Sequence, residues 1–150
     1  MSNTYTQIEF DKIIQDPKLE LPLNNAMACA WVMGNFKGFN LKVLDVSKRS
    51  SLADYFIIGS ASNPTQATSM AQEILFQFKR HGTLPVSIEG LRESDWILLD
   101  LGDVIVHIFM DLARDNYGLD EVYENCPQIK IPQEYYFSGP EEQSEDKGYF

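Results

Sequence analysis

The segment from Asp54 to Met110 constrains the fold more than any other part of this chain. Its apolar residues form one short run at Tyr55 to Gly59, recur at helical spacing, and return as two runs, Trp96 to Leu101 and Val104 to Met110. Short continuous runs indicate buried strands, and a spacing of three and four residues indicates one buried helix face. The order strand, helix, strand, strand predicts a sheet with a helix packed against it.

The helix in this segment is predicted to begin at Asn63-Pro64. Asn can cap free amide groups, and Pro in the first turn loses no needed hydrogen bond. Gly82 ends the helix, and Pro85 to Glu89 predicts a further strand. Gly102-Asp103 predicts the tight turn of an antiparallel hairpin. The apolar positions of the helix form one buried stripe: Ala67, Met70, Ala71, Ile74, Leu75 and Phe78.

The remaining elements complete an α/β pattern. Leu23 to Phe36 predicts a helix that Gly38 stops, and Leu41 to Val46 predicts a strand that pairs with the run at Tyr55. A last helix is expected from Leu112 to Tyr123, where Gly118 costs about 1 kcal/mol relative to Ala and can break it. We therefore predict a single-domain sandwich of helices on a mixed sheet of about five strands.

The ends of the chain differ from its middle in composition. Residues 1–22 are polar and contain Pro17 and Pro22, which predicts a loosely ordered segment. Residues 23–125 are predicted to form the domain. Residues 126–150 contain prolines, become acidic, and have too little apolar content to fold independently, so we expect a disordered tail.

The charge balance of the chain bears on its partners. The 150 residues are 44% hydrophobic, which is enough for one domain with a buried core. They include 12 basic and 22 acidic residues, for a net charge of −10. Such a charge repels a phosphate backbone, so we expect no direct nucleic-acid binding. It suits a basic protein partner, although solubility alone also explains it.

Cysteine placement and hydropathy bear on the compartment. Cys29 and Cys126 are far apart and neither belongs to a C-x-x-C pair, so neither a zinc site nor a disulfide framework is indicated. We find no run of about 18 apolar residues that predicts a membrane span, and no signal-peptide pattern at the start. These patterns predict a cytoplasmic protein in a reducing compartment.

An enzyme is the sharpest alternative from a different class. Gly59-Ser60 after an apolar strand is similar to the Gly-Ser turn of nucleotidyltransferases, which also need two metal-binding carboxylates. The strand that follows offers only Glu89, and Glu93 and Asp95 have a suitable spacing but lie in a loop. We expect Gly59-Ser60 to form a tight strand-to-helix turn, with no catalytic residue, no metal site and no cofactor.

Several motifs between Leu41 and Tyr123 occur together in one order. They are LDVSKRSSLADYFIIGSAS, a helix containing Gln66, the segment from Pro85 to Gly90, DWILLDLGDVIVHIF, and then Arg114 and Tyr117. This set resembles the ribosomal silencing factor family, also called RsfS or Iojap-like. The resemblance implies binding to the large ribosomal subunit through its fourteenth protein, which blocks joining with the small subunit and represses translation. It also implies a role in large-subunit maturation.

The strand that starts at Trp96 carries the predicted partner-binding residues. Trp96, Leu98 and Asp100 share one face of it, and the resemblance places a tryptophan at this position. Core packing is the alternative role for the Trp96 ring. His107 lies in the next apolar strand, on a face with Ile105 and Phe109. We predict that it contacts a partner, against the simpler role of a hydrogen-bonded structural histidine.

Two turns beside this strand complete the predicted surface. Glu89-Gly90 and Gly102-Asp103 would flank it, and their carboxylates would pair with basic groups of a ribosomal partner. Ordinary turn chemistry is the alternative for both. An exposed strand edge or helix face would also allow two copies to form a homodimer, so a bare oligomerisation module is a further alternative to silencing.

Overall fold

A six-stranded mixed sheet forms the centre of the protein, in a computed structural model that describes residues 4–92 and 95–137. The strand order is β3-β4-β5-β2-β1-β6, and the neighbours β2 and β5 run parallel. The predicted α/β class and mixed sheet are confirmed, with one strand more than the expected five. The elements are α1 Thr4–Ile14, α2 Leu23–Asn35, β1 Phe39–Asp45, β2 Tyr55–Ala61, α3 Pro64–Arg80, β3 Ser87–Glu89, β4 Trp96–Asp100, β5 Val104–Met110, α4 Asp111–Tyr117, α5 Leu119–Val122, β6 Gln128–Ile129 and the 3-10 helix η1 Gln133–Tyr135.

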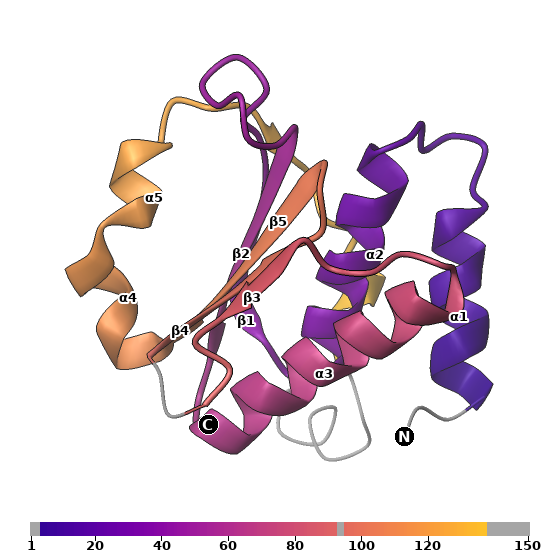
Figure 1. Ribbon diagram of the computed structural model, residues 1–150, viewed down its shortest axis with the longest axis horizontal. Coiled ribbons are helices and arrows are strands. Elements are labelled where there is room, and N and C mark those ends of the chain that lie inside the picture. Colours follow the sequence, from indigo (N-terminus) through magenta and orange to yellow (C-terminus); the bar gives the residue numbers. More distant parts are fainter. Residues whose placement is uncertain (1–3, 93–94, 138–150) are drawn as a thin grey trace.

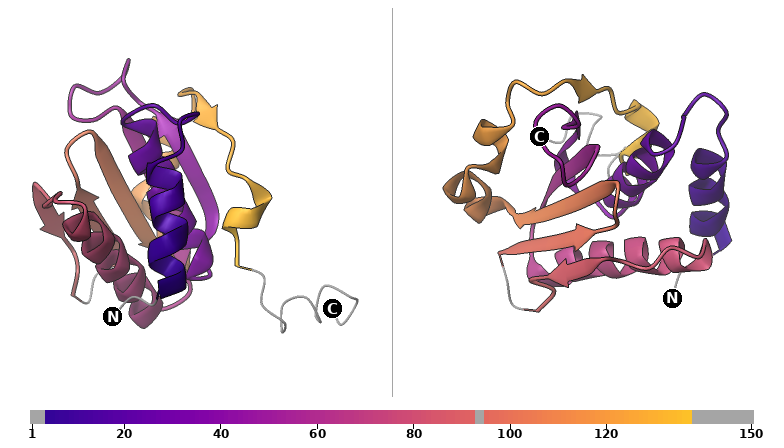
Figure 2. Two further views of the ribbon diagram at one scale, coloured as in Figure 1. Left: turned by 90° about the vertical axis from the view of Figure 1, so that its right-hand side faces the viewer. Right: turned by 45° about the horizontal axis from the view of Figure 1, so that its top comes forward.

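The helices cover the two faces of the sheet unequally (Figure 1). Helices α2 and α3 pack on one face, and α1 lies outside α2, whereas the short helices α4 and α5 lie on the opposite face. The two further views in Figure 2 show the same separation of helices by the sheet. The two sides of the sheet therefore have different covers.

Helix α3 forms as its sequence predicts. The Asn63 side chain accepts a hydrogen bond from the Gln66 backbone amide at 2.8 Å, and the apolar stripe faces the main core. The Gln66 side chain also accepts from the Ser62 amide at 2.7 Å and donates to the Phe36 carbonyl at 2.9 Å. Gln66 thus ties the start of α3 to the end of α2.

The predicted strand-to-helix turn at Gly59-Ser60 is wrong, because both residues lie inside β2. A Cβ atom at Gly59 would overlap the side chains of Met33 and Leu41, so this glycine allows α2 to pack closely on the sheet. The two predicted hairpins are confirmed: β1 pairs with β2, and β4 with β5, both antiparallel. Strand β2 extends two residues past the predicted end, which moves the turn beyond Ser60.

The segment predicted to be loosely ordered at the start of the chain contains a docked helix, so that prediction is wrong for α1. Phe10 is fully buried, and its ring meets that of Phe78 edge-on at 5.2 Å. Asp11 accepts a hydrogen bond from Arg80 at 2.7 Å. The Asn24 side chain donates to the Ile14 carbonyl at 3.0 Å, which fixes the end of α1 against α2.

The predicted disordered tail is also wrong over its first part. Strand β6 pairs with β1, where Ile129 lies opposite Val43. Tyr135 is buried, and a Cβ atom at Gly34 would overlap its carbonyl oxygen. These apolar residues dock the segment on the core despite its prolines. Residues 138–150, where the tail was also expected to be disordered, lie outside the described residues.

The last predicted helix divides at Gly118, which adopts a left-handed conformation with φ of 67°. Helix α4 ends before this residue and α5 begins after it. The weak point expected at Gly118 is therefore a real break. Within the ranges that the structure describes, we find no helix with the length and apolar character needed to cross a membrane.

Candidate functional site

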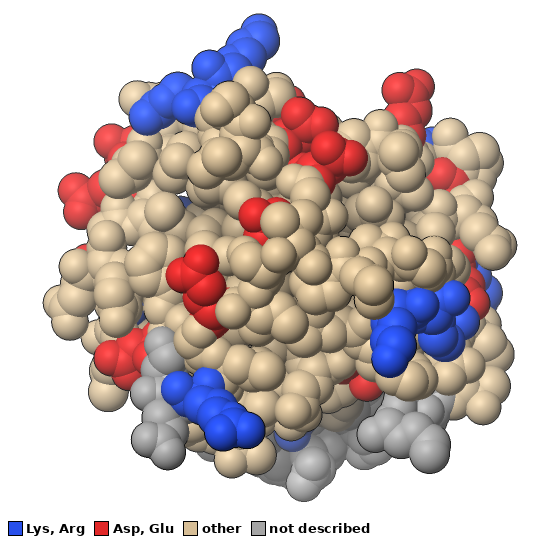
Figure 3. Space-filling view, viewed as in Figure 1, with Lys and Arg blue, Asp and Glu red and all other residues tan. Residues whose placement is uncertain are grey.

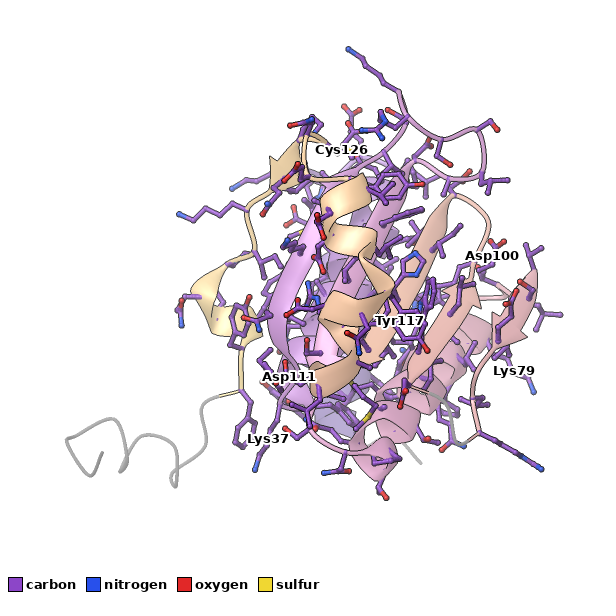
Figure 4. All side chains as sticks on the ribbon, turned by 90° about the vertical axis from the view of Figure 1, so that its left-hand side faces the viewer. Lys37, Lys79, Asp100, Asp111, Tyr117 and Cys126 are labelled. Carbon is purple, nitrogen blue, oxygen red and sulfur yellow. The ribbon has the colours of Figure 1, made fainter. Side chains whose placement is uncertain are left out.

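The sheet face that carries α4 and α5 is only partly covered. In Figure 4, these helices cross one part of the face, and Asp100 lies on the part beside them. We call this uncovered part the open face; it is formed by Trp96, Leu98 and Asp100 of β4 and Glu89 of β3. Leu98 lies opposite both Glu89 and His107 in the antiparallel registers, so these three residues share a face of the sheet.

Strand β4 separates core residues from open-face residues by simple alternation. Ile97 and Leu99 are buried in the main core, whereas Trp96, Leu98 and Asp100 are half-buried. The two-residue period of the strand explains this pattern. Trp96 and Leu98 also pack against a second apolar cluster beneath α4 and α5. The open face is thus the exposed margin of a small core.

Trp96 is held in a fixed orientation by its neighbours. Its indole Nε1 donates a hydrogen bond to His107 Nδ1 at 3.1 Å. Its ring stacks on Phe109 with 5.0 Å between centroids and meets Tyr117 at 4.9 Å. The core-packing role applies in part, because the indole packs in a cluster while part of it stays exposed; contact with a partner stays a prediction. A rigid, half-exposed aromatic ring is suited to anchor an interface.

His107 lies beneath this surface rather than on it. Its side chain is buried, so the prediction that it contacts a partner is corrected: it supports Trp96 from below. Because Nδ1 accepts from Trp96, the proton of the neutral ring lies on Nε2, which has no hydrogen-bond partner among the described residues. Burial lowers the pKa of His107 to about 3, so the ring is neutral at physiological pH.

The acidic residues of the predicted surface lie on the open face and in the turn beside it. Glu89 is exposed and pairs across the sheet with Leu98, and Gly90 after it has φ of 75°. At the end of β4, Asp100 accepts a hydrogen bond from the Gly102 amide at 2.9 Å, and Asp103 in the following turn is exposed. The Asp100 contact is ordinary turn chemistry. The carboxylates of Glu89 and Asp103 remain accessible to a basic partner.

Arg114 fixes α4 and α5 to the sheet and was not predicted as a structural anchor. Its buried guanidinium donates to Asp120 at 2.8 and 2.9 Å, to the Ser60 hydroxyl at 2.9 Å and to the Asn40 carbonyl at 2.8 Å. Lys42 also pairs with Asp120 at 2.8 Å. The hydrogen bonds of Arg114 and Lys42 hold the pKa of Asp120 well below its usual range.

Tyr117 is the second residue that sequence reasoning left out of the site. It lies on the side of α4 toward the open face and is 47% exposed beside Trp96 (Figure 4). Arg114 and Tyr117 both belong to the motif set quoted above. The signal was therefore present in the sequence, but nothing local showed which residues they contact.

The geometry does not favour nucleotidyl transfer. Ser60 is fully buried, and its hydroxyl is taken by Arg114. A search of residues 4–92 and 95–137 shows no group of three His, Cys, Asp or Glu side chains arranged to hold a metal ion. Glu93, one of the two loop carboxylates considered earlier, lies outside the described residues.

Surface charge on the side that Figure 3 shows is dispersed. The Lys and Arg side chains of that side form small groups separated by uncharged surface, with acidic side chains between them. Phosphate-backbone binding needs a continuous basic track. On this side of the molecule the charge pattern agrees with the expectation that nucleic acid is not the partner.

Comparisons with known proteins point to one family. The family model described as "Ribosomal silencing factor during starvation" matches residues 20–148. The chain is 35% identical over 88 residues to the ribosomal silencing factor RsfS of Bacillus subtilis, covering 59% of this chain and 75% of that one. It is 34% identical over 87 residues to RsfS of Zymomonas mobilis, covering 58% of this chain and 65% of the relative's length.

A more distant relative and a solved structure extend the comparison. The mouse protein named "Mitochondrial assembly of ribosomal large subunit protein 1" is 26% identical over 84 residues, which cover 54% of this chain and 37% of that protein. A crystal structure of a Chromobacterium violaceum protein superposes with a TM-score of 0.62 at 26% identity. It covers 70% of this chain and 90% of that one.

Proposed function

Because the chain belongs to the ribosomal silencing factor family, we propose that it binds the large ribosomal subunit through its fourteenth protein and blocks joining with the small subunit. The protein would repress translation by occupying a surface that the small subunit needs. This action requires no reaction and no cofactor. A cytoplasmic location and a role in maturation of the large subunit belong to the same proposal.

The observation that carries this proposal is the construction of the open face. Trp96 is half-exposed yet fixed by a hydrogen bond to His107 and by stacking on Phe109. A ring that is already ordered loses little side-chain entropy on binding, which favours affinity. Anchors of this kind contribute 2 kcal/mol or more in many protein interfaces.

Charge around the open face supports a basic partner. Glu89 on this face and Asp103 in the turn after β4 are exposed, and the whole chain carries a net charge of −10. Ribosomal proteins are generally basic, so opposite charges would speed their encounter with this surface. The proposal therefore predicts binding that weakens as ionic strength increases.

The experiment that tests this proposal is co-sedimentation with isolated large subunits, followed by a subunit-joining assay. We expect the wild-type protein to travel with the large subunit and to reduce formation of joined ribosomes. Glu89→Lys changes an exposed side chain of the open face and should weaken binding. Glu20→Lys is the matched control, since Glu20 is exposed in the α1–α2 loop on the other side of the sheet.

The two variants separate surface recognition from overall charge. Both raise the net charge by two units, so equal loss of binding would contradict a role for the open face. Absence of wild-type binding to large subunits at low and moderate salt would overturn the proposal itself. Trp96→Phe is a further test of binding through the open face. Phenylalanine keeps a packed ring at this position but removes the indole N–H that donates to His107.

A further inference from the structure

A cavity of about 740 Å³ lies beside the open face, at the carboxyl ends of β2 and β5. The topology explains its position. Strands β2 and β5 are parallel neighbours, but the chain leaves β2 into α3 on one side of the sheet and leaves β5 into α4 on the other. A crevice opens where consecutive helices diverge in this way, and such crevices commonly bind ligands.

The walls of the cavity combine apolar surface with two carboxylates. Phe39, Pro64, Met110 and Leu112 supply the apolar part, and Asp95 and Asp111 supply the acidic part. Neither carboxylate forms an ion pair with another side chain in the described part of the chain. The lining thus combines apolar contact surface with uncompensated negative charge.

The sign of the charge decides which ligands fit. The N-termini of α3 and α4 meet the cavity, and each contributes roughly half a positive charge at most. The two carboxylates contribute two negative charges, so the site keeps roughly one negative charge. A phosphate or other anion is therefore disfavoured here, and a single cation is favoured.

The cavity is continuous with the open face through α4 and β4. Leu112, 95% exposed on α4, lines the cavity, and Tyr117 of the same helix packs on Trp96. Asp95 directly precedes Trp96, and its carbonyl accepts a hydrogen bond from the Met110 amide at 2.9 Å. A protein that covers Trp96 therefore lies next to residues that line the cavity.

We propose that this cavity receives an arginine side chain of the protein partner that covers the open face. The inference rests on the proposed function, and it assigns a specific anchor point to that interface. The aliphatic stem would lie against Phe39 and Leu112, and the guanidinium would donate hydrogen bonds to Asp95 and Asp111. Arginine suits these walls because its flat guanidinium packs on aromatic rings and donates from two edges.

Two measurements test this inference. The first is an NMR titration of the full chain with N-acetyl-arginine methylamide, with N-acetyl-norleucine methylamide as the uncharged probe. We expect the arginine probe to shift the Leu112 methyl signals and the Ala113 amide signal more than the norleucine probe does. An Asp95→Asn/Asp111→Asn double variant should lose that difference.

The second measurement is co-sedimentation of the same double variant with large ribosomal subunits. We expect its binding to fall by about tenfold or more, as for the loss of a close charged contact. The control is Asp115→Asn/Glu124→Asn, which removes the same charge from exposed residues that do not line the cavity. Urea unfolding of each variant shows whether the fold is retained.

The outcomes distinguish this inference from the proposed function. If wild type binds large subunits and the double variant binds equally well, the proposed arginine site is wrong. The proposed silencing function would then still stand. If the arginine probe shifts the cavity signals but wild type does not bind large subunits, the cavity stands and the proposed partner is wrong. Equal changes of the NMR signals with both probes would contradict a role for the Asp95 and Asp111 charges in binding.

Discussion

The two faces of the sheet differ in the helices that cover them and in the side chains that they carry. The face under α2 and α3 is closed by long helices and packed with fully buried apolar side chains, including Ile57, Ile74 and Leu99. The other face is partly covered by α4 and α5, and its cluster packs around a histidine and a tryptophan that hydrogen-bond each other. One face supplies stability, and the other presents a partly exposed but rigid surface.

The difference shows how a small domain can keep an aromatic surface ordered without burying it. Stacking on Phe109 and hydrogen bonding to His107 orient Trp96 from below, and α4 contributes the Tyr117 ring beside it. The predictions below test this division between the faces, beginning with the largest effect.

Adjacent residues of β4 offer the most direct comparison. Leu99→Ala should lower the free energy of unfolding by about 3.5 kcal/mol, because a fully buried leucine leaves a cavity in the main core. Leu98→Ala, on the half-buried side, should cost about 1 kcal/mol. Urea denaturation measures both. Similar losses for the two variants would contradict the division of the sheet into a stabilising face and a contact face.

Arg114→Ala tests what holds α4 and α5 against the sheet face that they partly cover. Loss of the guanidinium removes the donor to the Ser60 hydroxyl and two hydrogen bonds of Asp120, which keeps its ion pair with Lys42, and should cost about 3 kcal/mol in unfolding free energy. Amide hydrogen exchange in α4 and α5 should increase more than in α3. Asp115→Ala, an exposed change on the same helix, is the control and should stay within about 0.5 kcal/mol of wild type. Uniform exchange across all helices would argue against a local anchor.

The burial of His107 predicts a pH effect on the free energy of unfolding that originates on the sheet face carrying α4 and α5. Burial lowers the pKa of His107 from 6.5 to about 3, so the folded state resists protonation that the unfolded state accepts. Its contribution to stability is complete above pH 6.5 and is lost progressively as the pH falls toward 3. Between pH 7 and pH 5 the expected loss is about 2 kcal/mol.

His107→Gln provides the reference for this pH effect. Glutamine can still accept a hydrogen bond from Trp96 but does not titrate. The difference between wild type and variant in urea unfolding at the two pH values isolates the histidine from His81 and the carboxylates. The same pH dependence in both proteins would show that His107 is not the titrating group.

The smallest effect concerns the aromatic contact at the edge of α4. Tyr117→Ala should cost about 1 kcal/mol in stability, the usual value of an aromatic pair. It should also expose Trp96, which we expect to see as stronger acrylamide quenching of fluorescence in a Trp31→Phe background. Unchanged quenching would mean that Tyr117 does not shield the indole.

Local patterns were sufficient to predict the parts of the fold that depend on neighbouring residues. Helix α3 is one example, because its cap, stripe and end all lie within 20 residues of sequence. The alternation in β4 is another, and it correctly separated Trp96 and Leu98 from Ile97 and Leu99.

The missed features depend on contacts between residues far apart in the sequence. Arg114 meets Ser60 across 54 residues and Asn40 across 74, so neither its burial nor its role was visible locally. Helix α1 buries Thr6 and Phe10, and its Phe10 ring packs on Phe78, so its one buried apolar residue leaves little helical periodicity. His107 was placed on the correct face, but sequence could not show that Trp96 covers it.

The docking of the C-terminal segment affects when the protein can fold during its own synthesis. Tyr135 packs against Gly34, and β6 completes the sheet beside β1, so the end of the domain covers its earliest strand and α2. A nascent chain that lacks residues 128–137 leaves this edge and helix surface uncovered. Completion of the native state must therefore wait until these last residues emerge from the ribosome, and chains truncated before them should be targets for chaperones and proteases.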